Sequence, residues 1–405
     1  MIVLVIVAFC EFRRLKHFDV GQSWLLDDLH TCYEGVMRKL LTLWLDVKYR
    51  MQPWSIRSKL DKLQLLLDNL RMPNTTSRRP RRIAIYSSYK ASEFKAIVHF
   101  GFSAFQTILK SKYYNNFLKF VYAMNIGNGD KTTKDDVSAV ELLMNEFVFE
   151  FENLYTTRHC SSNIHSMQHA HLSVQYIGPF FTYSTFFFES INRILKSLAH
   201  GTIEHSKQLI KNLELFRTSI IHYDSPIYPR LLSNLCEQLL NEKKATVNNT
   251  VNLPKQSQLT YHSYTDFLSG IFGLGNITFF DTIYYNNTRY ETNIQHSRKT
   301  NDSCIMFKQL NSAEMHLGFI SAIITVDNNN ENIYFLMNKI VIKNMFKIKL
   351  LNQTEIFLSN SSVCLIEKDS LVLIRLVDVQ QKLVFRFITE KQLHVFKYPN
   401  LKESS

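Results

Sequence analysis

Two short stretches carry the acidic residues of this chain that could do chemistry. Asp27 stands three residues before His30, and Glu189 follows the aromatic run Phe186–Phe188. Carboxylates hold hard divalent ions near a phosphodiester, and a site for two such ions uses several of them. Asp27 and Glu189, with His30 beside the first, therefore predict part of a metal-dependent nuclease site. A complete site would need a third acidic group.

Each of these carboxylates also has a purely structural interpretation. Asp27 or Asp28 could cap the helix that begins there, and Glu189 could be a first-turn acid, because helix N-termini favour negative charge. Residue types alone favour this structural role. The 162 positions between Asp27 and Glu189 exclude a local motif, so a shared site requires tertiary contact.

Basic and histidine clusters offer further candidates. Arg78, Arg79, Arg81 and Arg82 form a loop that would contact phosphates well, although a solvated loop explains the run equally well. His165 and His169 lie four apart, a spacing that suits zinc. No third ligand stands at a diagnostic position, so packing or hydrogen bonding is the expected role of these histidines.

Composition indicates a globular protein with a polyanionic partner. The chain has 405 residues, of which 45% are hydrophobic and 20% charged, with a net charge of +12. Residues 1–90 hold 16 Lys and Arg against 8 Asp and Glu, so the positive excess is concentrated early. A basic balance of this kind suits nucleic acid.

The cysteines and the N-terminus argue against a secreted protein. Six cysteines are scattered without a C-x-x-C pair, which predicts reduced thiols in an intracellular compartment. Residues 1–10 are apolar but too few to cross a bilayer, and their basic neighbours follow the apolar run instead of preceding it. We expect a buried strand or the start of a truncated reading frame there.

The elements that would position these residues are mainly helical at first. Leucines at helical spacing over 33–72 predict two helices separated by Pro53 and ended by Pro73. Further helical patterns cover 91–126, 133–155, 161–176, 189–200 and 203–244, with a short extended segment at 180–188. Residues 245–262 are polar and typical of a linker. From about 303 onward the pattern changes to short β-type runs at 304–307, 316–326, 333–341, 363–366, 371–377 and 383–389.

Taken together and in order, the motifs resemble the transposase-like proteins related to CACTA-type cut-and-paste DNA transposons. The likeness covers roughly residues 18–215, and its most specific parts are 90–94 and 178–202. The matching pieces are Phe18-Asp19-Val20, Asp27-x-x-His30, Gly35-Val36, Leu43-Trp44-Leu45-Asp46, Pro53-Trp54, Arg79-Pro80-Arg81, Tyr89-Lys90-Ala91-Ser92-Glu93-Phe94-Lys95, Asn163-Ile164-His165 with His169, Gly178-Pro179, Tyr183-Ser184, Phe188-Glu189-Ser190 and His200-Gly201-Thr202.

The resemblance implies an RNase H-like catalytic core of the Asp-Asp-Glu type, interrupted by a helical insertion. Asp27 would be the second metal-binding Asp, with His30 in its Asp-x-x-His motif, and Glu189 would be the closing Glu. Mg²⁺ or Mn²⁺ held there would activate water and then a DNA 3′-hydroxyl. The family's first Asp would precede residue 1, and Asp19 matches another position, so we expect an N-terminally truncated protein without transposition activity.

The expected fold is therefore α+β and mostly helical: a partial RNase H-like core with a large helical insertion, then a small antiparallel β domain. The expected boundaries are 1–30 for the partial core, 31–176 for the insertion, 177–245 for the returning core segment, 246–302 for a linker and 303–405 for a β-barrel or sandwich. The expected partner is DNA, in the nucleus and with no membrane, and a homo-oligomer stays open. The alternative is a domesticated DNA- or chromatin-binding protein without catalysis.

Overall fold

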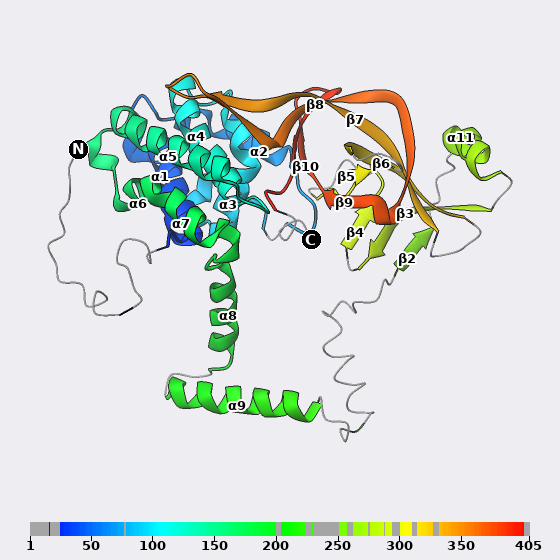
Figure 1. Ribbon diagram of the computed structural model, residues 1–405, viewed down its shortest axis with the longest axis horizontal. Helices are drawn as coiled ribbons and strands as arrows, with labels where there is room; N and C mark the ends of the chain where they lie inside the picture. Colours follow the sequence, from blue (N-terminus) through cyan, green and yellow to red (C-terminus); the bar gives the residue numbers. More distant parts are fainter. Residues whose placement is uncertain are drawn as a thin grey trace.

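Helices and an antiparallel sheet make up the protein, so the α+β expectation is confirmed at this coarse level. The computed structural model describes residues 16, 25–76, 78–199, 204–223, 229, 251–256, 262–273, 276–286, 288–293, 300–309, 314–326 and 332–400. The helices form a body at one end, and the sheet lies at the other (Figure 1). No helix in these ranges is long and apolar enough to cross a membrane.

The helical body is built from short helices around an aromatic core. Trp44 packs edge-on against Phe117, and its Nε1 donates to the Tyr155 hydroxyl at 2.8 Å. The helices are η2 (Asp28–Met37), α1 (Arg38–Leu45), η3 (Val47–Tyr49), η4 (Arg57–Lys59), α2 (Leu60–Asp68), η5 (Ile83–Ser88), α3 (Ala91–His99), η6 (Gly101–Phe105), α4 (Ser111–Gly127), α5 (Lys134–Tyr155), η7 (Thr157–His159), α6 (Ser162–Ser166), η8 (Met167–His169) and α7 (Ala170–Ile177).

Two further helices leave this body. The short turn η9 (Phe180–Thr182) leads into α8 (Phe186–Ser197), which projects away from the other helices, and α9 (His205–Tyr223) follows it (Figure 1). No residue of α8 is buried. The extended segment expected at 180–188 is wrong, because Thr182 and Glu189 donate to carbonyl groups three and four residues back and close helical turns there.

The sheet is antiparallel throughout its named strands. Its main path runs β1-β10-β11-β8-β7-β6-β3-β2, with β4 beside β3 and with β5 between β6 and β9. The strands are β1 (Leu70–Arg71), β2 (Val251–Gln256), β3 (Ile277–Tyr285), β4 (Thr288–Glu291), β5 (Cys304–Lys308), β6 (Met315–Val326), β7 (Ile333–Lys349), β8 (Glu355–Arg375), β9 (Val379–Lys382), β10 (Val384–Phe387) and β11 (Gln392–Phe396); the turn η10 (Leu376–Asp378) links β8 to β9, and helix α11 (His262–Phe272) follows β2.

Strands that are neighbours in the sequence do not always pair with each other. Strands β9 and β10 are separated only by Leu383, yet β9 pairs with β5 while β10 pairs with β11. Two β-type runs expected as separate strands, 363–366 and 371–377, belong largely to the single strand β8. The polar residues between the two runs lie where the pairing of β8 with β7 shifts register.

The sheet and the helical body share one core, so an independent β domain beginning at 303 is wrong. The far ends of β7 and β8 reach over the helices (Figure 1), and Phe102 packs against both Phe346 and Phe396 with ring centroids 5.5 Å apart. Strand β1 from the helical region also pairs with β10. Side chains from both parts therefore leave water together, which couples their stability.

The linker expected over 246–302 is also wrong within the described residues. That stretch contains β2, α11, β3 and β4, and β3 pairs with β6 of the main sheet. Its polar and Asn-rich composition concealed the apolar residues of β3 that are buried in the sheet, such as Phe280 and Ile283. Of the partial core expected at 1–30, only residues 16 and 25–30 are described; the segment 177–245 is described to 199, at 204–223 and at 229.

A buried ion network joins the sheet to the loop after β1. Asp302 and Lys382 are almost fully buried, and the Lys382 Nζ donates to Asp302 Oδ1 at 2.6 Å and to Asn74 Oδ1 at 2.9 Å. Asp302 Oδ1 also accepts from the Asn74 backbone N–H at 3.0 Å. Burial lowers the pKa of Lys382, while neighbouring Asp302 opposes that shift. The network fixes the two parts because neither charge is tolerated without its partner.

We predict that Lys382→Met lowers the free energy of unfolding by about 3 kcal/mol, because it leaves Asp302 buried without its main cation. Chemical denaturation monitored by circular dichroism measures the loss. The control Lys347→Met removes an exposed pair with Glu355 and should cost about 1 kcal/mol or less. Equal losses from the two variants would contradict this role of Lys382.

Candidate functional site

Asp27 caps the first described helix, as its structural interpretation predicts. Its Oδ1 accepts from the Leu29 N–H at 3.1 Å, and its Oδ2 accepts from the His30 N–H at 3.4 Å. The helix η2 that follows is a π-helix, a geometry found mostly in short pieces and often at functional sites. Asp27 is thus fixed by the backbone it caps, with its side chain one-quarter exposed.

Two neighbouring hydroxyls hold the start of α8 against this helix. The Thr185 Oγ1 donates to Asp27 Oδ1 at 2.6 Å, and the Ser184 Oγ donates to Asp28 Oδ1 at 2.6 Å. Asp28 is fully buried, so the hydrogen bond from Ser184 offsets part of the large cost of removing its carboxylate from water. We call these four residues the Asp–hydroxyl clamp. It joins segments more than 150 residues apart.

The clamp brings the three predicted site residues together. The His30 Nδ1 contacts Asp27 Oδ2, and the His30 Nε2 lies 3.7 Å from Glu189 Oε1. His30 and Glu189 have half-exposed side chains, so the cluster faces solvent. The structural order is therefore carboxylate, imidazole, carboxylate, with the histidine between the two acids. Asp27 and Glu189 are 162 positions apart in the sequence, so tertiary contact forms this cluster, as expected for a shared site.

This arrangement does not fit the two-ion site expected from the acidic residues. Both oxygens of Asp27 already accept hydrogen bonds, and the two ring nitrogens of His30 contact the two carboxylates that would have to hold Mg²⁺. Throughout the described part of the chain, no group of three or more His, Cys, Asp or Glu side chains is placed to hold a metal. The cluster presents carboxylate and imidazole groups to solvent.

The packing of η2 depends on close approach at Gly35. A Cβ built there would collide with the Asn163 side chain of α6 and the His30 carbonyl. Glycine is therefore required where these helices meet, because any larger side chain would push α6 away from η2. Gly178, with φ of 104°, ends α7 in a conformation that L side chains rarely adopt and turns the chain toward η9.

The four predicted DNA-binding arginines divide into two kinds. Arg81 forms a bidentate pair with Glu93, with Nε–Oε1 and Nη2–Oε2 distances of 2.7 Å, and Arg79 donates to the Leu70 carbonyl at 2.9 Å. Burial lowers the pKa of Arg79. Contacts within the protein therefore hold these two guanidinium groups, and phosphate contact by the four arginines stays a prediction. Arg78, 4.0 Å from Glu93, and Arg82 remain exposed.

His165 and His169 pack against each other with ring centroids 5.5 Å apart. This agrees with the packing role expected of them. The described cysteines Cys32, Cys160, Cys304 and Cys364 are free thiols. Burial raises the pKa of Cys32 well above its usual value, with Asp28 and Asp27 adding to the effect, so this thiol stays protonated beside the clamp.

Neither a protein-family model nor a curated protein matches this chain.

Three members of the clamp were missed from the sequence as functional residues. Ser184, Thr185 and Asp28 have no motif of their own, and small hydroxyls are common in turns. The one available signal was their position: Asp28 adjoins Asp27, and Tyr183-Ser184 lies within the most specific part of the family likeness. A pairing across 156 positions leaves no periodicity that a single sequence would display.

We predict that Ser184→Ala frees the start of α8 from η2. Loss of the hydroxyl removes a hydrogen bond to the buried Asp28 carboxylate, which should cost about 1–3 kcal/mol. Hydrogen exchange of the α8 amides should become faster in this variant. Ser197→Ala, which removes an exposed hydroxyl at the other end of α8, is the matched control and should leave the exchange near η2 unchanged. Equal protection in both variants would contradict the clamp.

Proposed function

We propose that this is a transposase-derived protein that binds DNA in the nucleus without cleaving it. The observation that carries the proposal is the convergence of Asp27, His30 and Glu189. These residues were selected from motifs far apart in the sequence, and an unrelated fold would have no reason to bring them together. The RNase H-like core and the helical insertion implied by the same motifs are part of this proposal.

The same cluster favours the non-catalytic form of the proposal. Phosphodiester cleavage by two ions needs carboxylate oxygens that are open to the metals. Here Asp27 uses its oxygens to cap η2 and to accept from Thr185, and His30 separates it from Glu189. A role retained after loss of cleavage, as in a domesticated DNA- or chromatin-binding protein, requires only a basic surface.

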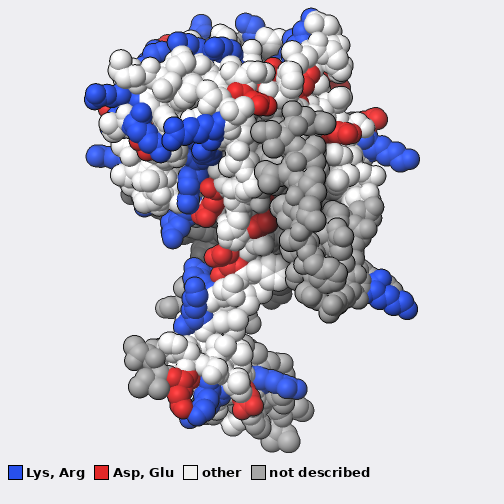
Figure 2. All heavy atoms as spheres, turned by 90° about the vertical axis from the view of Figure 1, so that its left-hand side faces the viewer, with Lys and Arg blue, Asp and Glu red and all other residues white. Residues whose placement is uncertain are grey.

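Exposed basic side chains supply such a surface. Figure 2 shows Lys and Arg gathering over the helical body on one face of the molecule. The early part of the chain, which has the charge excess, contributes several exposed basic residues: Lys48, Arg50, Arg57, Lys59, Lys62, Arg78 and Arg82. Contacts with phosphates position a protein on DNA without reading its sequence, and they release counterions. The expected binding is therefore independent of sequence and sensitive to salt.

We predict that the double variant Arg78→Glu/Arg82→Glu binds duplex DNA more weakly than the unchanged protein. If each arginine contacts one phosphate, the slope of log affinity against log salt should decrease in magnitude by about 1.8. Mobility-shift titrations at several salt concentrations measure it. Arg79 and Arg81 are left in place, because their loss would disturb the fold.

The matched control is Lys131→Glu/Lys391→Glu, which changes the net charge by the same amount at exposed lysines in the α4–α5 loop and the β10–β11 turn, outside the basic residues named above. A purely global charge effect would weaken both double variants equally. DNA binding that is absent at low salt would contradict the proposed function itself. An unchanged slope in Arg78→Glu/Arg82→Glu would remove these two residues from the contact surface.

We further predict no nicking of bound plasmid DNA in Mg²⁺ or Mn²⁺. Loss of metal positioning and charge stabilisation costs orders of magnitude in rate, because both act in the transition state. Agarose gels of supercoiled plasmid after long incubation provide the measurement. Cutting that disappears in both Asp27→Asn and Glu189→Gln would contradict the non-catalytic proposal and restore a catalytic role for this cluster.

A further inference from the structure

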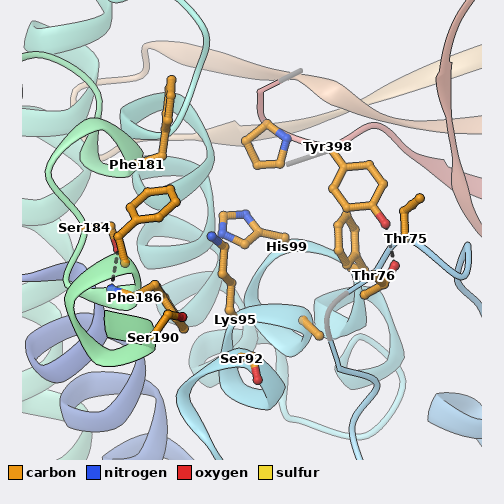
Figure 3. A pocket seen from close by; sticks show the side chains of 14 residues that line it. Thr75, Thr76, Ser92, Lys95, His99, Phe181, Ser184, Phe186, Ser190 and Tyr398 are labelled. Atoms are coloured by element: carbon orange, nitrogen blue, oxygen red, sulfur yellow. Dashed lines mark hydrogen bonds between the residues drawn. The ribbon is translucent and has the colours of Figure 1, made fainter. Parts of the chain in front are cut away.

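A pocket of about 390 Å³ lies between the start of α8, helix α3 and the residues that follow β11. Its size is within the range of small-molecule sites. Figure 3 shows Lys95 and His99 of α3 in the middle, Ser184, Phe186 and Ser190 on one side, and Thr75, Thr76 and Tyr398 on the other. It borders the Asp–hydroxyl clamp through Ser184, and it is distinct from the Asp27–His30–Glu189 cluster.

One part of this pocket suits an anion. The Lys95 Nζ lies 5.1 Å from the Phe186 ring centroid and 5.8 Å from that of Tyr33, contacts that hold its ammonium group at the wall. Ser92 in the first turn of α3 and Phe187 in the first turn of α8 also line the space, so the N-termini of two helices adjoin it. Helix N-termini and a lysine together favour a phosphate group.

Another part suits a planar aromatic group. Phe100, Phe181, Phe186, Phe187 and Tyr398 contribute rings to the lining. Phe187 is half exposed, so part of its ring can be reached by a ligand that enters the pocket. Stacking on such rings accepts any nucleobase, because every base has a π-face.

Two further lining residues, Ser184 and His99, provide polar groups of fixed orientation. The Ser184 hydroxyl donates to Asp28 and its oxygen accepts from the Phe186 N–H at 3.5 Å, which leaves one lone pair for a base amino group. His99 is held at both ring nitrogens, by the Tyr33 hydroxyl and by Asn125 Oδ1, each at 2.8 Å. The Asn125 oxygen also accepts from the Asn360 amide, which identifies His99 Nδ1 as the donor in its contact with Asn125. The His99 ring therefore has a fixed orientation in the lining of the pocket.

We propose that this pocket binds one nucleotide unit, with its base among the aromatic rings and its phosphate at Lys95. The same unit can come from a free nucleoside monophosphate or from an unpaired nucleotide at the end of a DNA strand. The second source rests on the proposed function, whereas the first does not. A pocket of this size holds a single unit, so duplex DNA would engage it only after unstacking a base.

The experiment is isothermal titration calorimetry of the full chain with each of the four deoxynucleoside 5′-monophosphates, and with inorganic phosphate for comparison. Saturable binding of at least one nucleotide, more tightly than phosphate, is expected. Lys95→Met should weaken it by about 10-fold, since a hydrogen bond to a charged group is lost. Phe187→Ala should weaken it by about 5-fold or more through lost stacking. Lys131→Met, at an exposed lysine outside the pocket, should have no effect.

A second arm compares blunt duplex DNA with the same duplex carrying a one-nucleotide 5′-phosphorylated overhang. Tighter binding of the overhang, lost in Lys95→Met and Phe187→Ala, identifies the strand end as the source. No preference, together with binding of free nucleotide, identifies the free nucleotide. Absence of nucleotide binding and of overhang preference, or equal effects of Lys131→Met and Lys95→Met, would overturn the proposal.

Arg78→Glu/Arg82→Glu separates this proposal from the proposed function. It should weaken duplex binding while leaving the affinity for free nucleotide unchanged, because neither arginine lines the pocket. If duplex DNA is not bound but a nucleotide is, the proposed function fails and the pocket assignment stands. Thermal unfolding of Lys95→Met and Phe187→Ala checks that both variants are folded.

Discussion

A carboxylate can be buried only where donors replace the water it loses, and the placement of Asp28 beside Ser184 is the constraint on which the rest of the site depends. Thr185 donates to Asp27 in the same way, so two successive acids meet two successive hydroxyls. That pairing sets where α8 begins. The position of Glu189 near His30 and the pocket wall formed by Phe186 both follow from it.

The second constraint is a core shared by helices and strands. The long strands β7 and β8 reach the helical body, where Phe346 and Phe396 pack against Phe102. The buried pair of Asp302 and Lys382 joins the sheet to the loop after β1 at another point. The loop carrying Arg78 and Arg82 therefore sits on a body fixed from both sides, and the basic surface has a defined geometry.

The arginine run shows how folding redistributes groups that look equivalent in the sequence. Four arginines lie within five positions, yet Arg81 neutralises the buried Glu93 and Arg79 caps a backbone carbonyl. A sequence shows the charge of a side chain but not the group within the fold to which that side chain binds. The same holds for Asp27, whose capping role and whose contact with His30 are both real.

The sequence alone determined most helices and several strands, because apolar periodicity is a local property. Leucine spacing located α1 and α2, and alternating apolar residues located β5 and β6. It also selected Asp27, His30 and Glu189 as candidates. Tertiary structure decided that these three meet, that β2, β3 and β4 join the sheet instead of linking two domains, and that an imidazole stands between the acids. Long-range pairing and burial produce these features, and neither leaves a period in the sequence.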